Sequence, residues 1–114
     1  MREWTLQHPL WDIEDAHLVR YVKTSDYPSG ARIIEAQVAL AERLDHHPVV
    51  TFTYRRLRFE LWTHDRDGLT QLDLDYAEGL DALIDWYIEH RSWWQAILHR
   101  SKGYRAYYAK QYSR

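Results

Sequence analysis

Three histidines near the middle of the chain are the residues best suited to chemistry. His46 and His47 are adjacent, and His64 follows one predicted hairpin later. The pKa of imidazole is ordinarily about 6.5, so at neutral pH it takes up or releases a proton at little cost. Such groups around one pocket could remove one proton while delivering another, although three imidazoles could also bind a metal ion. The isolated histidines are predicted to be structural: His8, His17, His90 and His99.

A predicted β-hairpin brings the three histidines together. The segments on either side of Arg55-Arg56 are rich in β-branched and aromatic residues, and the second alternates apolar and polar side chains. If these two arginines form the connection, His47 faces His64 across the hairpin. Arg-Arg lacks the Gly or Asn that two-residue turns favour, so a different register stays open.

The elements before the hairpin place the histidine pair. Residues 1–10 are expected to be an irregular start, residues 11–13 and 17–24 two strands, and residues 31–44 an amphipathic helix. Pro48 favours an extended conformation at the residue before it. The pair therefore lies at a junction of helix and strand, where rigid elements hold side chains that still reach solvent.

A second amphipathic helix is predicted after the hairpin. Thr70 and Asp73 resemble a capping box with Asp in place of Glu, and apolar residues then recur at helical spacing from about residue 71 into the high eighties. The order of elements is two strands, helix, two strands, helix. It predicts an α+β fold, with a four-stranded antiparallel sheet and two long helices on one face.

The end of the chain differs from the rest in charge. Residues 91–114 contain basic and aromatic residues and no acidic ones, so we predict a domain over residues 1–90 and a C-terminal extension of one or two helices. The aromatic side chains of the extension either pack on the protein or on a neighbouring subunit, or they form a docking surface for an acidic protein partner. Binding to nucleic acid is not expected, because no nucleic-acid-binding fold is recognised.

The composition limits the classes of protein to consider. A chain of 114 residues can form one hydrophobic core, and oligomerisation would help to stabilise it. The absence of cysteine excludes disulfides and a thiolate site, and it suits a reducing compartment. No apolar run approaches the length needed to span a bilayer. A cytoplasmic protein without membrane association is therefore expected.

The central segment resembles the signature of the pterin-4a-carbinolamine dehydratases. That signature is a charged residue, three residues, His-His-Pro, five residues, Tyr, nine residues, His, eight residues and Asp. Every position is met by Glu42, His46, His47, Pro48, Tyr54, His64 and Asp73. The resemblance covers roughly residues 11–85. It implies the same α+β fold, a homodimer or homotetramer, and a pterin as substrate.

The resemblance also implies a reaction and a set of site residues. Water leaves a 4a-hydroxytetrahydropterin to give a quinonoid dihydropterin, which recycles the cofactor of aromatic amino acid hydroxylases without a metal ion or other cofactor. His46 and His64 would form the acid/base pair, and His47 would hold the pterin ring. The positions that match the pterin pocket are Asp45, Trp62, Thr63 and Asp65.

Two carboxylates are expected to support the imidazoles. Glu42, one helical turn before the histidine pair, could orient an imidazole and keep its proton on the useful nitrogen. Asp73 could do the same, or it could simply cap the second helix.

Departures from the family pattern leave a second function open. Val49 and Val50 stand where the family commonly has an acidic residue and then a large apolar residue, which puts the pocket wall in question. The C-terminal extension is also foreign to the family. Relatives of this fold serve as assembly or dimerisation factors, so the alternative is a non-catalytic factor that binds another protein through residues 91–114.

Overall fold

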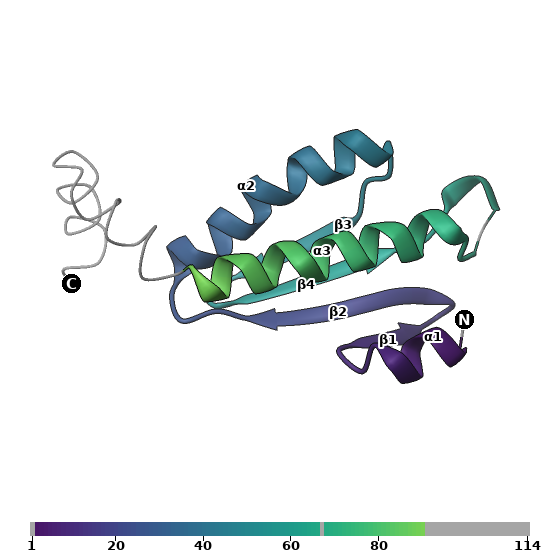
Figure 1. Ribbon diagram of the computed structural model, residues 1–114, viewed down its shortest axis with the longest axis horizontal. Coiled ribbons are helices and arrows are strands. Elements are labelled where there is room, and N and C mark those ends of the chain that lie inside the picture. The colour runs from purple at the N-terminus through teal and green to yellow at the C-terminus, as the bar shows by residue number, and fades with distance from the viewer. Residues whose placement is uncertain (1, 67, 91–114) are drawn as a thin grey trace, which may run out of the picture. The chain divides into compact units, whose positions relative to one another are not determined.

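The computed structural model describes residues 2–66 and 68–90 (Figure 1). Their elements, in chain order, are α1 (Arg2–Gln7), β1 (Trp11–Glu14), β2 (His17–Lys23), α2 (Tyr27–Leu44), β3 (Val49–Thr53), β4 (Arg56–Leu61), the short 3₁₀ helix η1 (His64–Arg66) and α3 (Gln71–Glu89). The chain divides into two compact units, residues 1–83 and residues 84–114. The predicted C-terminal extension lies outside the described residues.

The four strands form one antiparallel sheet in the order β1-β2-β4-β3. Within the first unit, α2 and the part of α3 up to Leu83 lie over the same face of this sheet (Figure 1). The predicted fold class, an α+β protein with two long helices on one face of a four-stranded antiparallel sheet, is confirmed.

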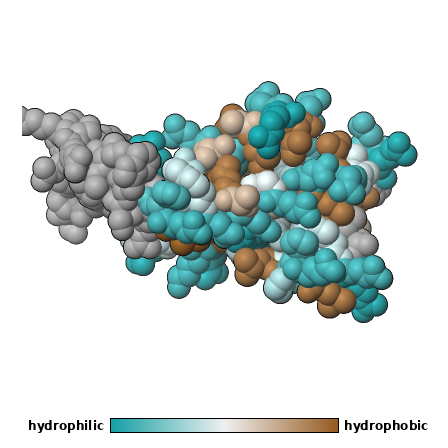
Figure 2. All heavy atoms as spheres, in the orientation of Figure 1, coloured by the Kyte–Doolittle hydropathy of each residue, from teal (hydrophilic) through white to brown (hydrophobic). Residues whose placement is uncertain are grey.

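The core lies between the sheet and these two helices. Leu57, Phe59 and Leu61 alternate along β4 with partly exposed residues and are almost completely buried. Leu40 from α2 and Leu80 from α3 are buried as well. Burying each such side chain stabilises the fold by about 1.5–3 kcal/mol. On the face shown in Figure 2, hydrophilic residues cover much of the surface and apolar residues form separate patches.

A glycine allows α2 and α3 to approach each other closely. A Cβ atom added to Gly79 would lie 2.8 Å from Cδ1 of Leu40, which is closer than real Cβ contacts. Glycine inside a helix costs about 1 kcal/mol relative to alanine. The close packing of the two helices explains why the residue is nevertheless present in α3.

An ion pair between buried Arg20 and partly exposed Asp81 ties the sheet to α3. The guanidinium of Arg20 in β2 donates to Asp81, and the indole Nε1 of Trp11 in β1 donates to the same carboxylate at 2.9 and 3.1 Å. Arg20 and Trp11 are both buried, so neither donor could be left unpaired without a large desolvation cost. The contact fixes the position of α3 along the sheet.

The hairpin turn differs from the prediction. Thr53 pairs with Arg56, so the connecting residues are Tyr54 and Arg55 rather than the two arginines. Tyr54 has a φ of 40°, a left-handed conformation that non-glycine residues rarely adopt. The backbone N–H of Thr24 donates to the carbonyl oxygen of Arg55 at 2.8 Å. Thr24, which follows β2, is distant from Arg55 in the sequence, so the local sequence pattern around the turn did not predict this contact.

The predicted pairing of His47 with His64 is therefore wrong. The β3–β4 ladder begins at Val49, which faces Glu60, and His64 lies beyond β4 in η1. The register is displaced by two residues. Because side chains alternate with a period of two, each residue of β4 keeps the face that was predicted for it.

Two helix starts also differ from the prediction. Residues Arg2–Gln7 form a helix instead of an irregular start, and α2 begins at Tyr27 instead of residue 31. Asp26 caps α2 by accepting from the backbone N–H of Ser29 at 2.9 Å. Pro28 lies in the first turn, where its missing N–H has no helical partner to lose. It therefore opens the helix rather than ending a loop.

Within the described residues, no helix is long and apolar enough to cross a membrane.

Candidate active site

The centre of the candidate site is a buried imidazole–carboxylate pair. Nε2 of His46 lies 2.6 Å from Oδ1 of Asp73, and the two side chains are 8% and 0% exposed. His46 follows Asp45, the residue that caps the end of α2, and its backbone N–H donates to the carbonyl oxygen of Ala41 at 3.0 Å. Asp73 lies in the first turn of α3. Two helix ends therefore hold the pair.

Asp73 both orients His46 and caps α3. Its Oδ2 accepts from the backbone N–H of Thr70 at 2.9 Å and from the hydroxyl of Thr63 at 2.8 Å. The hydroxyls of Thr63 and Thr70 also lie 2.6 Å apart. A carboxylate with three donors is well compensated for its burial. The two roles that the sequence left open for Asp73 therefore hold together.

The contact with Asp73 determines which nitrogen of His46 is available for chemistry. A carboxylate accepts hydrogen bonds, so it favours the tautomer with hydrogen on Nε2. Nδ1 then carries the lone pair. If Nδ1 takes up a proton, the adjacent carboxylate stabilises the imidazolium that forms. This arrangement suits a general base.

His47 has a different environment from its neighbour. Its Nε2 lies 3.1 Å from Oε1 of Glu42, and the two side chains are 56% and 71% exposed. Glu42 thus contacts His47 rather than His46. Between α2 and His46, Asp45 has φ 48° and ψ 47°, and its backbone N–H contacts the carbonyl oxygens of Ala41 and Glu42. Asp45 therefore ends the helix, and its own side chain is exposed.

His64 and Asp65 lie in η1 and are exposed. The ring of His64 stacks on the indole of Trp62, with centroids 4.3 Å apart and planes inclined by 20°. Thr63 lies between Trp62 and His64 in the sequence. Its backbone N–H and carbonyl group both hydrogen-bond to the backbone of Gly68, and its hydroxyl donates to Asp73. The loop that carries His64 is therefore tied to the carboxylate that holds His46.

The predicted site residues form connected pairs rather than one cluster of rings. In residues 2–66 and 68–90, no hydrogen bond or ring stacking joins any two of His46, His47 and His64. Within the same residues, no three His, Cys, Asp or Glu side chains are grouped so that they could hold a metal ion. The convergence of the three imidazoles on one bound pterin stays a prediction.

The sequence analysis missed a second imidazole–carboxylate pair beside the candidate site. Nδ1 of His17 in β2 lies 2.6 Å from Oε2 of Glu60 in β4, and Nη1 of Arg58 donates to Oε1 of Glu60 at 2.8 Å. These hydrogen bonds, that of His17 first, lower the pKa of the Glu60 carboxyl. The same contact with Glu60, followed by one with Tyr21, raises the pKa of Arg58. Alternation along each strand gives the face of each side chain within that strand, but only the pairing of β2 with β4 places His17 beside Glu60.

The structure also contains a basic pocket that none of the predicted site residues lines. Its volume is about 470 Å³. Its lining residues are Lys23, Thr53, Tyr54, Arg55 and Arg56. These residues surround the β3–β4 turn, whereas His64 follows the other end of β4. The pocket is therefore separate from the candidate acid/base residues.

The fold and site define an α+β protein in which a buried carboxylate orients an imidazole at the end of a helix. A family model described as pterin 4 alpha carbinolamine dehydratase matches residues 1–83. The chain belongs to this family, as the spacing of its histidines indicated.

Relatives in other organisms support the same assignment. The chain is 33% identical over 82 residues to a protein of Chloroflexus aurantiacus, and the match covers 72% of this chain and 88% of the relative. It is 40% identical over 73 residues to a protein of Metallosphaera sedula, with 64% and 76% covered. Both relatives carry the provisional name pterin-4-alpha-carbinolamine dehydratase.

Two solved structures resemble the fold. A transcriptional coactivator/pterin dehydratase from Brucella melitensis superposes with a TM-score of 0.68 and 28% identity, over 73% of this chain and 92% of that one. A pterin dehydratase-like protein identified as a RuBisCO assembly factor in the α-carboxysome superposes with a TM-score of 0.54 and 19% identity, over 65% and 86%. The second likeness concerns the fold alone.

Proposed function

We propose that this protein dehydrates a 4a-hydroxytetrahydropterin to a quinonoid dihydropterin. The observation that carries the proposal is the buried contact between His46 and Asp73, because it leaves one imidazole nitrogen with a lone pair and provides a counter-charge for the imidazolium. Membership of the family supplies the class of substrate. The reaction requires one proton to leave the pterin and another to arrive, which is the chemistry that imidazoles perform near neutral pH.

The proposed step uses two imidazoles. Nδ1 of His46 removes the proton from N5 of the pterin while protonated His64 delivers a proton to the 4a-hydroxyl. The C4a–O bond breaks, water leaves, and the N5 electron pair forms the double bond to C4a. Each positioned acid or base contributes on the order of 10² to 10⁴ in rate. Proton transfer alone completes the reaction, so the proposal includes no metal ion or organic cofactor.

The other predicted residues have binding roles in this proposal. In this proposal His47 holds the flat pterin ring, and Asp45, Trp62 and Asp65 line the pterin pocket. Thr63 is proposed to line the same pocket, and its hydroxyl also donates to Asp73, which supports His46. A homodimer or homotetramer in the cytoplasm is also proposed. The edge strands β1 and β3 provide unpaired backbone groups for such an assembly.

The test is turnover of chemically generated carbinolamine, followed through the formation of quinonoid dihydropterin. We expect His46→Ala and His64→Ala each to reduce kcat by about 10²-fold or more. His8→Ala serves as a control, because His8 contacts Trp4 and Glu78 and none of the proposed site residues. Wild-type turnover no faster than that of the His46→Ala/His64→Ala double variant would contradict the proposed dehydratase activity.

The same assay addresses the alternative of a non-catalytic assembly or dimerisation factor. The fold is compatible with such a role, since the RuBisCO assembly factor shares it. Absence of turnover, together with a partner protein that binds the whole chain and is lost on deletion of residues 91–114, would favour this alternative. Turnover that depends on His46 and His64 favours the enzyme.

A further inference from the structure

The two imidazoles of the proposed acid/base pair differ in what orients them. The side chain of His46 has a carboxylate partner, whereas that of His64 forms no hydrogen bond with the described residues. The ring contact described for His64 is the stack on Trp62. Because an exposed side chain without a hydrogen bond is free to rotate, the orientation of His64 depends on the position of this indole.

Trp62 is itself held by a second imidazole. The ring of His17 stacks on Trp62 with centroids 4.1 Å apart and planes inclined by only 6°. Trp62 is thus shared by two nearly parallel stacks, one with His17 and one with His64. Aromatic contacts of this kind contribute about 0.5–1.5 kcal/mol beyond the burial of apolar area. Two of them are enough to favour one orientation of the indole over its other rotamers.

The position of His17 is fixed by charged residues of the two neighbouring strands, β4 and β1. Glu60 accepts from Nδ1 of His17 at 2.6 Å and from Arg58 at 2.8 Å, and Arg58 also lies 3.5 Å from Glu14 in β1. Since hydrogen bonds lower the pKa of Glu60, the partner of His17 is a carboxylate at neutral pH. The side chains of His17 and Glu60 are only 23% and 20% exposed. The sheet therefore offers a rigid support for the indole.

We propose that His17 is a positioning residue for His64 and acts through the indole of Trp62. The inference rests on the proposed function, in which His64 delivers a proton to the departing hydroxyl. His17 does not touch the substrate in this scheme. Its contribution is to hold Trp62, and thereby His64, in the orientation that the reaction requires. A misplacement of about 1 Å can cost on the order of 10²-fold in rate.

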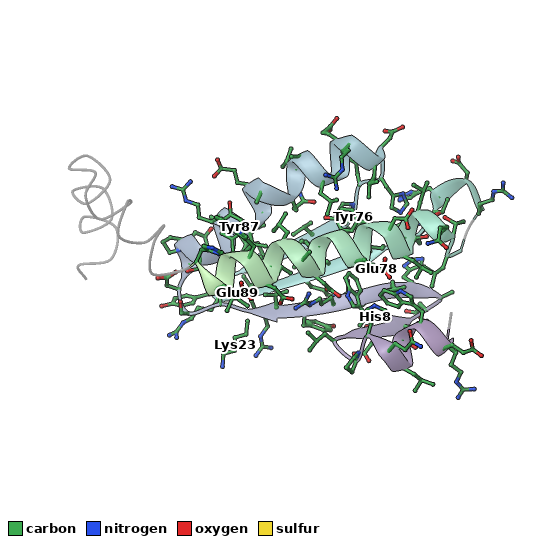
Figure 3. The ribbon with its side chains drawn as sticks, viewed as in Figure 1. His8, Lys23, Tyr76, Glu78, Tyr87 and Glu89 are labelled. Atoms are coloured by element: carbon green, nitrogen blue, oxygen red, sulfur yellow. The ribbon has the colours of Figure 1, made fainter. Side chains whose placement is uncertain are left out.

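The chain contains a matched control for this arrangement. His8 stacks on Trp4 with centroids 3.9 Å apart and planes inclined by 11°, and it has a carboxylate, Glu78, at 3.8 Å. His8 and Glu78 are labelled in Figure 3, where one belongs to the segment after α1 and the other to α3. This stack has the same chemistry as that of His17, and it does not include His64.

The experiment compares His17→Leu, His17→Phe and His8→Leu in the full chain. The first readout is the set of ¹H and ¹⁵N imidazole signals of His64, which the ring current of Trp62 displaces. We expect His17→Leu to move these signals toward those of an unstacked histidine. His17→Phe keeps a stacking ring and should move them less, and His8→Leu should leave them unchanged.

The second readout is the steady-state kinetics of carbinolamine dehydration. We expect His17→Leu to lower kcat by about 10-fold with little change in KM, because the loss affects the proton donor rather than binding. His17→Phe should recover most of kcat. A merely structural role for His17 would instead lower the yield of folded protein without this separation between the two substitutions.

The two readouts separate failure of the inference from failure of the proposed function. Unchanged His64 signals in both His17 variants, or equal shifts in His8→Leu, would overturn the positioning role whatever the activity. Wild-type protein without turnover would overturn the dehydratase proposal, while the signals of His64 would still decide whether His17 positions it. If His17→Leu does not fold, His17→Gln replaces it, because its amide can still donate to Glu60 but it has no ring to stack on Trp62. Unchanged His64 signals in His17→Gln would overturn the inference.

Discussion

The two imidazoles of the proposed acid/base pair lie in contrasting regions of the molecule. His46 is buried and hydrogen-bonded to Asp73, which also caps α3. His64 is exposed and rests on Trp62. The first region combines catalysis and stability in one carboxylate, whereas the second depends on ring stacking supported by the sheet. Substitutions near His46 should therefore reduce both folding and activity, and substitutions near His64 should affect activity more than folding.

The largest effect is expected for Asp73→Ala. The substitution leaves His46 buried without its partner and removes the cap from Thr70. Loss of one partner of a buried pair typically costs about 3–5 kcal/mol. We expect a decrease of that size in the free energy of unfolding, measured with a chemical denaturant. Asp75→Ala, at an exposed position in the same helix, should change it by less than about 0.5 kcal/mol.

Asp73→Asn sharpens the distinction between orientation and stability. The amide oxygen can still accept from the backbone N–H of Thr70, so we expect less destabilisation than with alanine. A neutral amide cannot stabilise an imidazolium at His46, so kcat should still fall by about 10²-fold or more. Circular dichroism melting curves and carbinolamine turnover together measure the two effects. Equal losses of stability in Asp73→Asn and Asp73→Ala would contradict the capping role.

The sequence predicted the fold well because β4 has a clear periodicity. Leu57, Phe59 and Leu61 recur every second residue and are all buried, and a displaced hairpin register did not change their face. The turn was predicted wrongly. Tyr54 has a left-handed conformation there, and the neighbouring Arg55 accepts a hydrogen bond from Thr24, which is distant in sequence. Contacts between distant segments leave little trace in the local pattern of one sequence.

In the candidate site, too, contacts between residues distant in sequence could not be predicted from the local sequence pattern. Glu42 and Asp73 were predicted to support imidazoles, and each contacts one. His17 was predicted to be structural because it is isolated in the sequence from the other histidines. Its partner Glu60 lies 43 residues further along the chain. His17 and Glu60 come close only because β2 and β4 are neighbours in the sheet, in a register that places Val19 opposite Glu60. The signature residues could be found from spacing, but their support from β2 could not.

In the region of His64, we expect Glu60→Gln to have an intermediate effect on the free energy of unfolding. Hydrogen bonds from His17 and Arg58 lower the pKa of Glu60 below its ordinary value of about 4.5. Glu60 therefore stabilises the folded protein above that pH, and the contribution is lost as the pH falls through the lowered pKa. We expect Glu60→Gln to be less stable than wild type by about 1 kcal/mol at pH 7. The difference should shrink below pH about 4.5.

Denaturant titrations of both proteins between pH 7 and pH 3 measure this difference. A difference that stays constant over the whole range would contradict the role of the ionised carboxylate. A difference as large as that of Asp73→Ala at pH 7 would remove the contrast between the two regions, because the pair of His17 and Glu60 would then stabilise the fold as strongly as the buried pair.

The smallest effect is expected for Glu42→Gln. Glu42 and His47 form an imidazole–carboxylate pair with nearly the same atoms as His46 and Asp73, but their side chains are 71% and 56% exposed. Water solvates both partners with or without the contact, so an exposed pair contributes about 0–1 kcal/mol. We expect Glu42→Gln to change the free energy of unfolding by less than about 0.5 kcal/mol and kcat by less than about twofold. If Glu42→Gln lowered kcat as much as Asp73→Asn does, burial would not explain the difference in catalytic importance between these two carboxylates.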